Sequence, residues 1–214
     1  MALFPNDRKA GKHSLADDAK AVENDGKRVA HRVTKDLERA ETLASMLAHS
    51  RASRTVEVAD MLAGMYIYEW ENLSKFWEQQ AEVETFLQQI CRISPQRWHH
   101  WIEFYDQHRH AKEPRKIWRL PQGLRPAKGK AAQPNGVPLL RSAELQNVLK
   151  TAEELSPARD FVDGRAIPIL TCECVLLAIA KKTDSEIGHR LVATGLNVTS
   201  LEESARNPKH APKH

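Results

Sequence analysis

The sequence has little cysteine, and its three cysteines do not have the spacing of a disulfide framework. Cys91, Cys172 and Cys174 are an odd set, and the last two stand only two positions apart, which disfavours a local disulfide. A Cys-x-Cys pair also lacks the Cys-x₂₋₄-Cys or His-x₃₋₅-His spacing that brings two ligands to one zinc ion. We therefore expect buried structural thiols in a reducing, cytoplasmic protein, with a redox or metal role for Cys172 and Cys174 as the alternative.

Long hydrophobic runs are also absent. Residues 1–18 do not contain the apolar stretch of a signal peptide, and no window comes near the roughly 18 apolar residues that cross a bilayer. The sequence therefore predicts a soluble protein that has no membrane partner. Charge of one sign is not in large excess either, since the formal net charge is only +4. By itself, this charge is weak evidence for a nucleic-acid partner.

Signatures of catalysis are missing as well. The phosphate-binding loop of ATPases has the form Gly-x₄-Gly-Lys-Ser/Thr. The nearest segment, residues 123–131, has one residue too many between its glycines and places Ala131 where a hydroxyl must hold Mg²⁺. The sequence also contains no His-Glu-x-x-His zinc motif and no Gly-x-Ser-x-Gly nucleophile elbow. We therefore expect a protein that is not an enzyme and needs no metal and no cofactor.

What the sequence does contain is helical periodicity. Apolar side chains recur every three or four positions between residues 27 and 49, and again from about residue 54 to residue 79. Ser94 followed by Pro95 predicts the start of another helix, because serine caps a helix and proline fits its first position. No segment has a convincing strand pattern, and Ala166 to Leu170 is interpreted as an apolar approach to the next helix. The predicted fold class is therefore all-α.

Proline and basic residues interrupt the helical pattern in residues 111–138. Proline blocks helices and removes backbone donors, so this segment is predicted to be an extended linker between two helical regions. The predicted organisation is a mobile arm at 1–26, an aromatic-rich helical region at 27–110, the basic linker at 111–138, a second helical module at 139–206 and a disordered tail at 207–214.

The basic linker is also a candidate nucleic-acid-binding segment. Between residues 110 and 138 the only acidic residue is Glu113, so the cations there would hold phosphates while Trp118 stacks on a base. The alternative is a solvated tether. The candidate nucleic-acid-binding residues are Arg115, Lys116, Trp118, Arg119, Arg125, Lys128 and Lys130.

Aromatic residues are concentrated between residues 66 and 105. The favoured interpretation is a helical core, because burying a large apolar side chain stabilises a protein by roughly 1.5–3 kcal/mol. The alternative is a surface for a protein partner, since Trp and Tyr are enriched at binding hot spots. The candidates for that surface are Trp98, Trp101 and Tyr105.

The stretch Thr171 to Ala205 has a distinctive order of helices. Glu173-Cys174-Val175-Leu176-Leu177-Ala178-Ile179 is predicted to form a short apolar helix, a second helix covers Ile187 to Val192, and Thr194-Gly195-Leu196-Asn197-Val198 leads into a third. This order resembles the repeat of the N-terminal domain of Clp-type AAA+ unfoldases. There, Glu-His-Leu-Leu-Leu-Ala-Leu opens one helix and Leu-Gly-Val-Asp ends the next. The upstream helix of the repeat is expected at Ser142 to Leu155.

The resemblance implies a helical module that docks adaptors and protein substrates. Carried over to this chain, the docking positions are Glu173 and Cys174, where Cys172-Glu173-Cys174 replaces the Thr-Glu-His of the family. The packing positions are Leu176, Leu177, Ile187, Leu191 and Leu196. The expected function is that of a non-catalytic, adaptor-like protein in protein quality control. The alternative is a nucleic-acid-associated regulatory protein that binds through the basic linker.

A single Clp N-like repeat would leave an apolar flank uncovered. The N-terminal helices would cover it, or a second copy of the chain would do so in a homodimer. Residues 57–65 loosely echo residues 173–179, since both place a Leu-Ala pair after a glutamate. They are therefore a candidate for a second, degenerate repeat.

Overall fold

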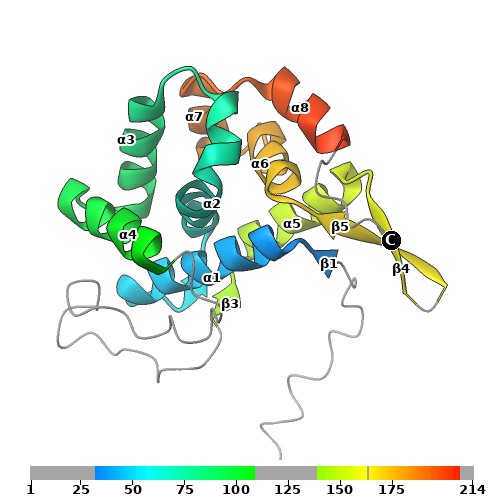
Figure 1. Cartoon of the computed structure of the whole chain (residues 1–214), viewed down its shortest axis with the longest axis horizontal. Helices are drawn as coiled ribbons and strands as arrows, with labels where there is room; N and C mark the ends of the chain where they lie inside the picture. The colour runs from blue at the N-terminus through cyan, green and yellow to red at the C-terminus, as the bar shows by residue number, and fades with distance from the viewer. Residues whose placement is uncertain (1–31, 109–138, 163, 208–214) are drawn as a thin grey trace, which may run out of the picture. The chain divides into compact units, whose positions relative to one another are not determined.

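The computed structural model describes residues 32–108, 139–162 and 164–207, and this part of the chain is mostly helical (Figure 1). The predicted arm, the candidate nucleic-acid-binding residues of the linker and residues 208–214 lie outside the described residues. None of the described helices combines the length and the hydrophobicity needed to cross a membrane. The helices are α1 (Lys35–Ser50), α2 (Val58–Leu73), α3 (Gln80–Cys91), α4 (Pro95–His108), α5 (Ala143–Leu155), α6 (Cys172–Lys181), α7 (Glu186–Ala193) and α8 (Val198–Arg206), with a 3₁₀ turn at Ser74–Phe76.

Capping side chains set several of the helix starts. Thr171 Oγ1 accepts a hydrogen bond from the backbone N–H of Cys174, at 3.2 Å, in the first turn of α6. The predicted start at Ser94 and Pro95 is confirmed, because α4 begins at Pro95 and Ser94 Oγ accepts from the backbone N–H of Arg97 at 3.4 Å. These caps satisfy N–H groups that have no partner inside the helix, which is why local sequence alone locates these boundaries.

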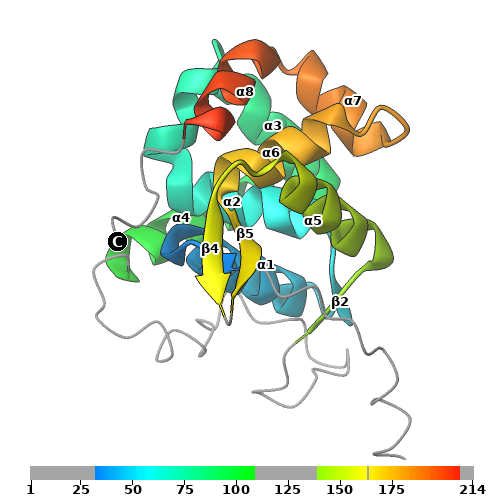
Figure 2. The ribbon, with the colours of Figure 1, turned by 90° about the vertical axis from the view of Figure 1, so that its right-hand side faces the viewer.

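The prediction that the chain has no strands is wrong. The strands are β1 (Arg32–Val33), β2 (Thr55–Val56), β3 (Leu140–Arg141), β4 (Arg159–Val162) and β5 (Arg165–Leu170). The segment interpreted as an approach to a helix belongs to β5, which pairs antiparallel with β4. This hairpin extends away from the helices in Figure 1 and lies in front of them when the molecule is seen from that side (Figure 2). The other three strands have two residues each, which is too short to show an alternation of polar and apolar residues.

The described elements fall into two halves with the same order: strand, helix, strand, helix, helix, helix. The first half runs from β1 to α4, and the second runs from β3 to α8 with β4 added before β5. The halves exchange their strands, because β1 pairs in parallel with β5 while β3 pairs in parallel with β2. The backbone N–H of Thr34 donates to the carbonyl of Leu170 at 3.0 Å, and that of Ser142 donates to the carbonyl of Val56 at 3.0 Å. The two sequence regions thus interlock, and residues 57–65 form the start of α2, the counterpart of α6.

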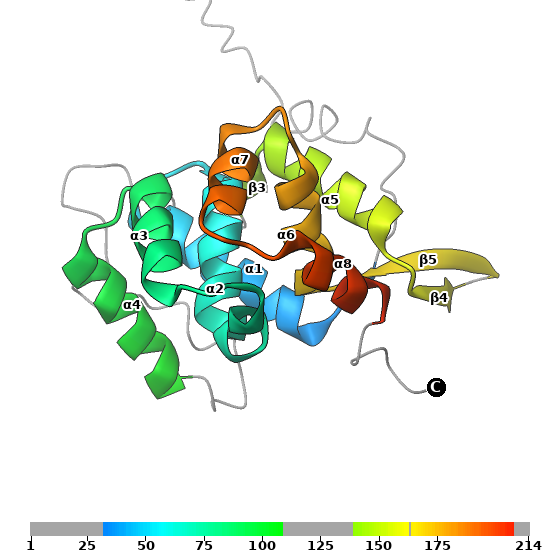
Figure 3. The same cartoon turned by 90° about the horizontal axis from the view of Figure 1, so that it is seen from above.

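The two halves share one hydrophobic core. Helices α2 and α6 lie side by side in the middle, with α3 and α4 on one side and α5 with the β4–β5 hairpin on the other (Figure 3). Buried apolar side chains from all eight helices belong to one cluster. The apolar flank of the C-terminal helices is therefore covered by the N-terminal helices of the same chain.

Gly64 allows α1 and α2 to approach closely. A Cβ atom at this position would stand 2.4 Å from the carbonyl oxygen of Ala40 and 2.9 Å from the backbone nitrogen of Ala44. Real Cβ atoms are not found this close to backbone atoms, so any side chain at Gly64 would push the two helices apart.

We expect Gly64→Ala to lower the free energy of unfolding by about 1–3 kcal/mol, as overpacked core substitutions do. Intrinsic helix propensity predicts the opposite sign, since alanine is favoured over glycine by about 1 kcal/mol inside a helix. Urea unfolding of both proteins measures the difference, with the exposed α5 substitution Lys150→Ala as the control. A Gly64→Ala variant that is as stable as the wild type or more stable would contradict the close contact.

Candidate functional site

Three of the five residues predicted to contact a protein partner belong to the core. Trp98 is 2% exposed, Trp101 is 0% exposed and Cys174 is 1% exposed, so none of them reaches solvent. The correction follows from packing, because the aromatic face of α4 lies against the middle of α2, where the rings of Trp98 and Tyr66 have centres 5.9 Å apart. The core interpretation of these tryptophans is the one that the structure favours.

The other two predicted residues are half-buried and lie in different places. Glu173 is in the first turn of α6, and Tyr105 is on α4, where its hydroxyl donates to the carbonyl oxygen of Tyr68 at 3.4 Å. The structure therefore does not bring the five predicted residues into one surface. Of the five, only Tyr105 lines the cavity described next. The other aromatic residues of its lining belong to the aromatic-rich stretch that is predicted to form a core, and its acidic residues are not among the predicted site residues.

This cavity, which we call the acidic–aromatic pocket, has a volume of about 480 Å³. It lies where the second half of α2 meets the start of α3 and the C-terminal half of α4. Helix α2 is kinked at Glu69, whose φ of −109° and ψ of 18° are not helical. The lining consists of the aromatic residues Tyr66, Tyr68, Trp70 and Tyr105, the acidic residues Glu69, Glu71, Glu84 and Asp106, and Ile67, Asn72, Gln80 and Ile102.

Hydrogen bonds fix two of the pocket's tyrosines. Tyr66 donates its hydroxyl to Glu84 Oε1 at 2.8 Å, and burial, with the neighbouring Glu84 carboxylate, raises the pKa of Tyr66 above its usual range. Tyr68 accepts from the guanidinium of Arg39 at 2.6 Å and donates to Asp36 Oδ1 at 3.2 Å, and burial is the main cause that raises its pKa as well. Both phenol groups are therefore protonated at neutral pH, and their hydrogen bonds hold the two rings in fixed positions.

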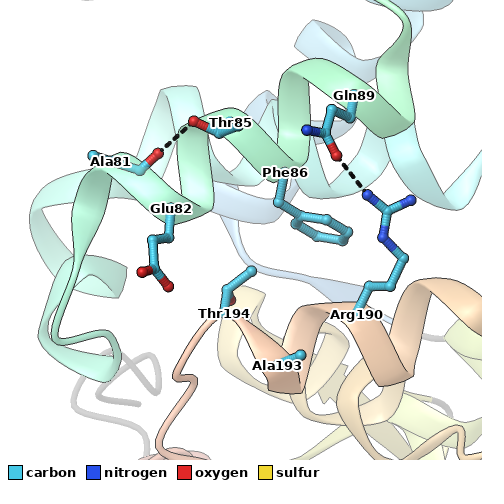
Figure 4. A pocket seen from close by; sticks show the side chains of 8 residues that line it. All are labelled: Ala81, Glu82, Thr85, Phe86, Gln89, Arg190, Ala193 and Thr194. Atoms are coloured by element: carbon cyan, nitrogen blue, oxygen red, sulfur yellow. Dashed lines mark hydrogen bonds between the residues drawn. The ribbon is translucent and has the colours of Figure 1, made fainter.

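A second cavity, the α3–α7 groove, lies between a helix of the first half and a helix of the second (Figure 4). It has a volume of about 440 Å³. Arg190 reaches from α7 so that its guanidinium carbon lies 5.3 Å from the ring centre of Phe86, and it donates to Gln89 Oε1 at 2.7 Å. The groove is lined by Ala81, Glu82, Thr85, Phe86, Gln89, Arg190, Ala193 and Thr194.

The cysteines are buried, as the sequence predicts. Burial raises the pKa of Cys91 to about 12 and raises that of Cys172 well above its usual value. Both side chains are therefore protonated thiols at neutral pH, which are poor nucleophiles and poor metal ligands. Within the described parts of the chain, no group of three or more His, Cys, Asp or Glu side chains is placed to hold a metal ion.

The local sequence does carry a signal for the acidic–aromatic pocket. Residues 66–71 read Tyr-Ile-Tyr-Glu-Trp-Glu, an alternation of aromatic and acidic residues that helical core packing alone does not require. The contributions of Glu84 and Asp106 have no such signal, because they come from other helices.

Comparisons of the chain with protein-family models, with curated proteins and with solved structures find no match in any of the three.

Proposed function

We propose that the chain is a non-catalytic, adaptor-like protein, related to Clp N-terminal domains, that binds a polypeptide in the α3–α7 groove and acts in protein quality control. The observation that carries the proposal is this groove at the junction of the two halves (Figure 4). Its apolar floor is the ring of Phe86, and its rim is made of exposed residues with small side chains, including Ala81, Thr85 and Ala193. A groove of this form leaves room for a chain segment along the two helices.

The polar groups of the groove suit a polypeptide. Every peptide unit that is taken out of water needs hydrogen-bond partners for its N–H and C=O groups. The Arg190 guanidinium is a multiple donor, and Gln89 supplies amide N–H donors beside the oxygen that it gives to Arg190. Glu82, also exposed in the lining, supplies acceptors. These side-chain donors and acceptors thus suit the backbone of a bound segment, and the Phe86 ring would contact one of its apolar side chains.

The sequence resemblance supports the same proposal. Thr171 to Ala205 resembles a repeat whose family docks adaptors and protein substrates, and α6 and α7 lie within this stretch. The groove joins α7 to α3, its counterpart in the first half, so a partner seated there would contact both halves at once.

Filling the groove is expected to abolish partner binding without unfolding the protein. Ala193→Trp places a large side chain at an exposed rim position of α7, and Ala143→Trp makes the same change at an exposed position of α5 outside the groove. The measurement is affinity purification of tagged wild-type and variant chains from the native cell, after nuclease treatment, with quantitative mass spectrometry of the bound proteins. Proteins that bind the wild type and Ala143→Trp should be lost, by tenfold or more, from Ala193→Trp.

Two outcomes would count against the proposal. Partners that bind all three proteins equally would show that the groove is not the binding site. If instead the wild type binds random-sequence DNA or RNA at about 100 mM salt and nuclease removes every partner, the protein belongs to the nucleic-acid-associated class.

A further inference from the structure

The floor of the α3–α7 groove is covered by a side chain from the opposite helix. Phe86 is only 5% exposed although it lines the groove, and the guanidinium carbon of Arg190 lies 5.3 Å from the centre of its ring. We propose that Arg190 is a gate, which a bound segment must displace before one of its side chains can contact Phe86. The gate controls the same groove, so this proposal rests on the proposed function and adds the residue that selects what enters.

Two contacts hold the gate closed. The guanidinium lies over the ring of Phe86, whose face attracts a cation. Its Nη2 atom also donates to Gln89 Oε1 at 2.7 Å, so that the side chain spans the groove from α7 to α3 (Figure 4). The other lining residues at the end of α7, Ala193 and Thr194, have short side chains. Arg190 is therefore the longest side chain that α7 contributes to the described lining.

The gate can open without leaving its charge unpaired. The Arg190 side chain is 41% exposed, so its outer side already meets water. Glu186 stands one helical turn earlier on α7, and its Oε1 atom lies 3.6 Å from Nη1 of Arg190. Because residues four apart share one face of a helix, a guanidinium that leaves Phe86 can stay beside this carboxylate. Opening therefore costs mainly the two contacts across the groove.

The gate makes the groove selective for large apolar side chains. An exposed cation–π contact corresponds to about 2- to 5-fold in an equilibrium constant and one hydrogen bond to about 2- to 10-fold, so the closed gate weakens binding by roughly 5- to 50-fold. Burying a leucine, methionine or phenylalanine side chain strengthens binding by about 10- to 150-fold, whereas one methyl group adds only about fourfold. A segment with a large apolar side chain can therefore displace Arg190, and one that offers only alanine or serine cannot.

The neutral apolar dye N-phenyl-1-naphthylamine tests the gate in the full-length chain, by fluorescence titration. Arg190→Ala should bind the dye about 5- to 50-fold more tightly than the wild type, because the ring of Phe86 is uncovered. Gln89→Ala removes only the hydrogen bond and should give a smaller gain of about 2- to 10-fold. Adding Ala193→Trp to Arg190→Ala fills the opened groove and should abolish the gain, whereas a loosened core would still bind the dye.

Arg206→Ala is the matched control. Arg206 also lies four residues after a glutamate, with 3.8 Å between its Nη2 atom and Glu202 Oε2, but it belongs to α8 and does not line the groove. This variant should bind the dye within about twofold of the wild type. The gate is overturned if Arg190→Ala gains no affinity, if the gain survives Ala193→Trp, or if Arg206→Ala shows the same gain.

Failure of the gate and failure of the proposed function give different results. A dye gain in Arg190→Ala, together with cellular partners that bind Ala193→Trp as well as the wild type, would support the gate and count against polypeptide binding in the groove. Partners that are lost from Ala193→Trp, without a dye gain in Arg190→Ala, would support polypeptide binding and overturn the gate.

Discussion

Replacing Arg51 with methionine is expected to lower the free energy of unfolding by about 3–5 kcal/mol at pH 7, the loss typical of removing one partner from a buried ion pair. The Asp60 side chain is 0% exposed, and its Oδ1 atom accepts a hydrogen bond from the Arg51 guanidinium. Its Oδ2 atom accepts from the backbone N–H of Glu57 at 2.9 Å, which closes the capping box of α2. Without Arg51, the carboxylate would be buried with no neutralising partner.

The same variant has a predicted pH dependence. Burial is the largest effect on Asp60 and raises its pKa above the ordinary 3.8, while Arg51 lowers it. A carboxyl group whose pKa is raised in the folded state contributes most to stability below its unfolded pKa, and the contribution is lost as the pH rises through the folded pKa. Removing Arg51 raises that pKa further. The stability difference between Arg51→Met and the wild type should therefore be smallest near pH 4 and largest at neutral pH.

Urea unfolding at several pH values measures this difference, and a second substitution gives the control. Asp60→Asn in the Arg51→Met background removes the charge but keeps an oxygen that can accept from Glu57. It should recover most of the lost stability. A loss in Arg51→Met that does not change with pH, or a double variant as unstable as the single one, would show that packing rather than the buried charge is responsible.

Trp101→Ala is expected to cost about 3–5 kcal/mol of unfolding free energy, as large aromatic-to-alanine changes in a core do. Trp101 is 0% exposed, and its ring meets that of Phe104 edge-on with centres 5.9 Å apart. Its indole Nε1 has no hydrogen-bond partner in the described structure, and burying such a group costs about 1–3 kcal/mol. Trp101→Phe, which removes that N–H and keeps a ring, should therefore lose much less.

This second prediction separates the two interpretations of the aromatic cluster. If Trp101 belonged to a partner surface, alanine there would weaken binding and leave stability nearly unchanged. Thermal unfolding of Trp101→Ala, with the exposed α4 substitution Gln107→Ala as a control within about 0.5 kcal/mol of the wild type, decides between them. A change of less than about 1 kcal/mol in Trp101→Ala would contradict the core assignment.

Local sequence predicted the features that depend on neighbouring residues. The start of α4 at Ser94 and Pro95 was predictable because capping involves one turn of helix, and the burial of the cysteines was predictable from their number and spacing. The helix predicted from about residue 54 to residue 79 contains α2, which carries Tyr66, Tyr68 and Trp70. The sequence could not show that Trp98 and Trp101 face inward, because an apolar stripe has the same spacing whether a core or a partner covers it.

By itself, the sequence determined that the described chain is mostly helical and where several of its helices begin, since periodicity and capping are local properties. The tertiary structure decided how these helices combine. Two-residue strands carry no periodic signal, so the exchange between β1 and β5 and between β2 and β3 appears only when distant segments meet. The same holds for the close crossing at Gly64 and for the acidic–aromatic pocket. Each depends on which helices pack together, and that is set by the shared core of the two halves rather than by any one segment.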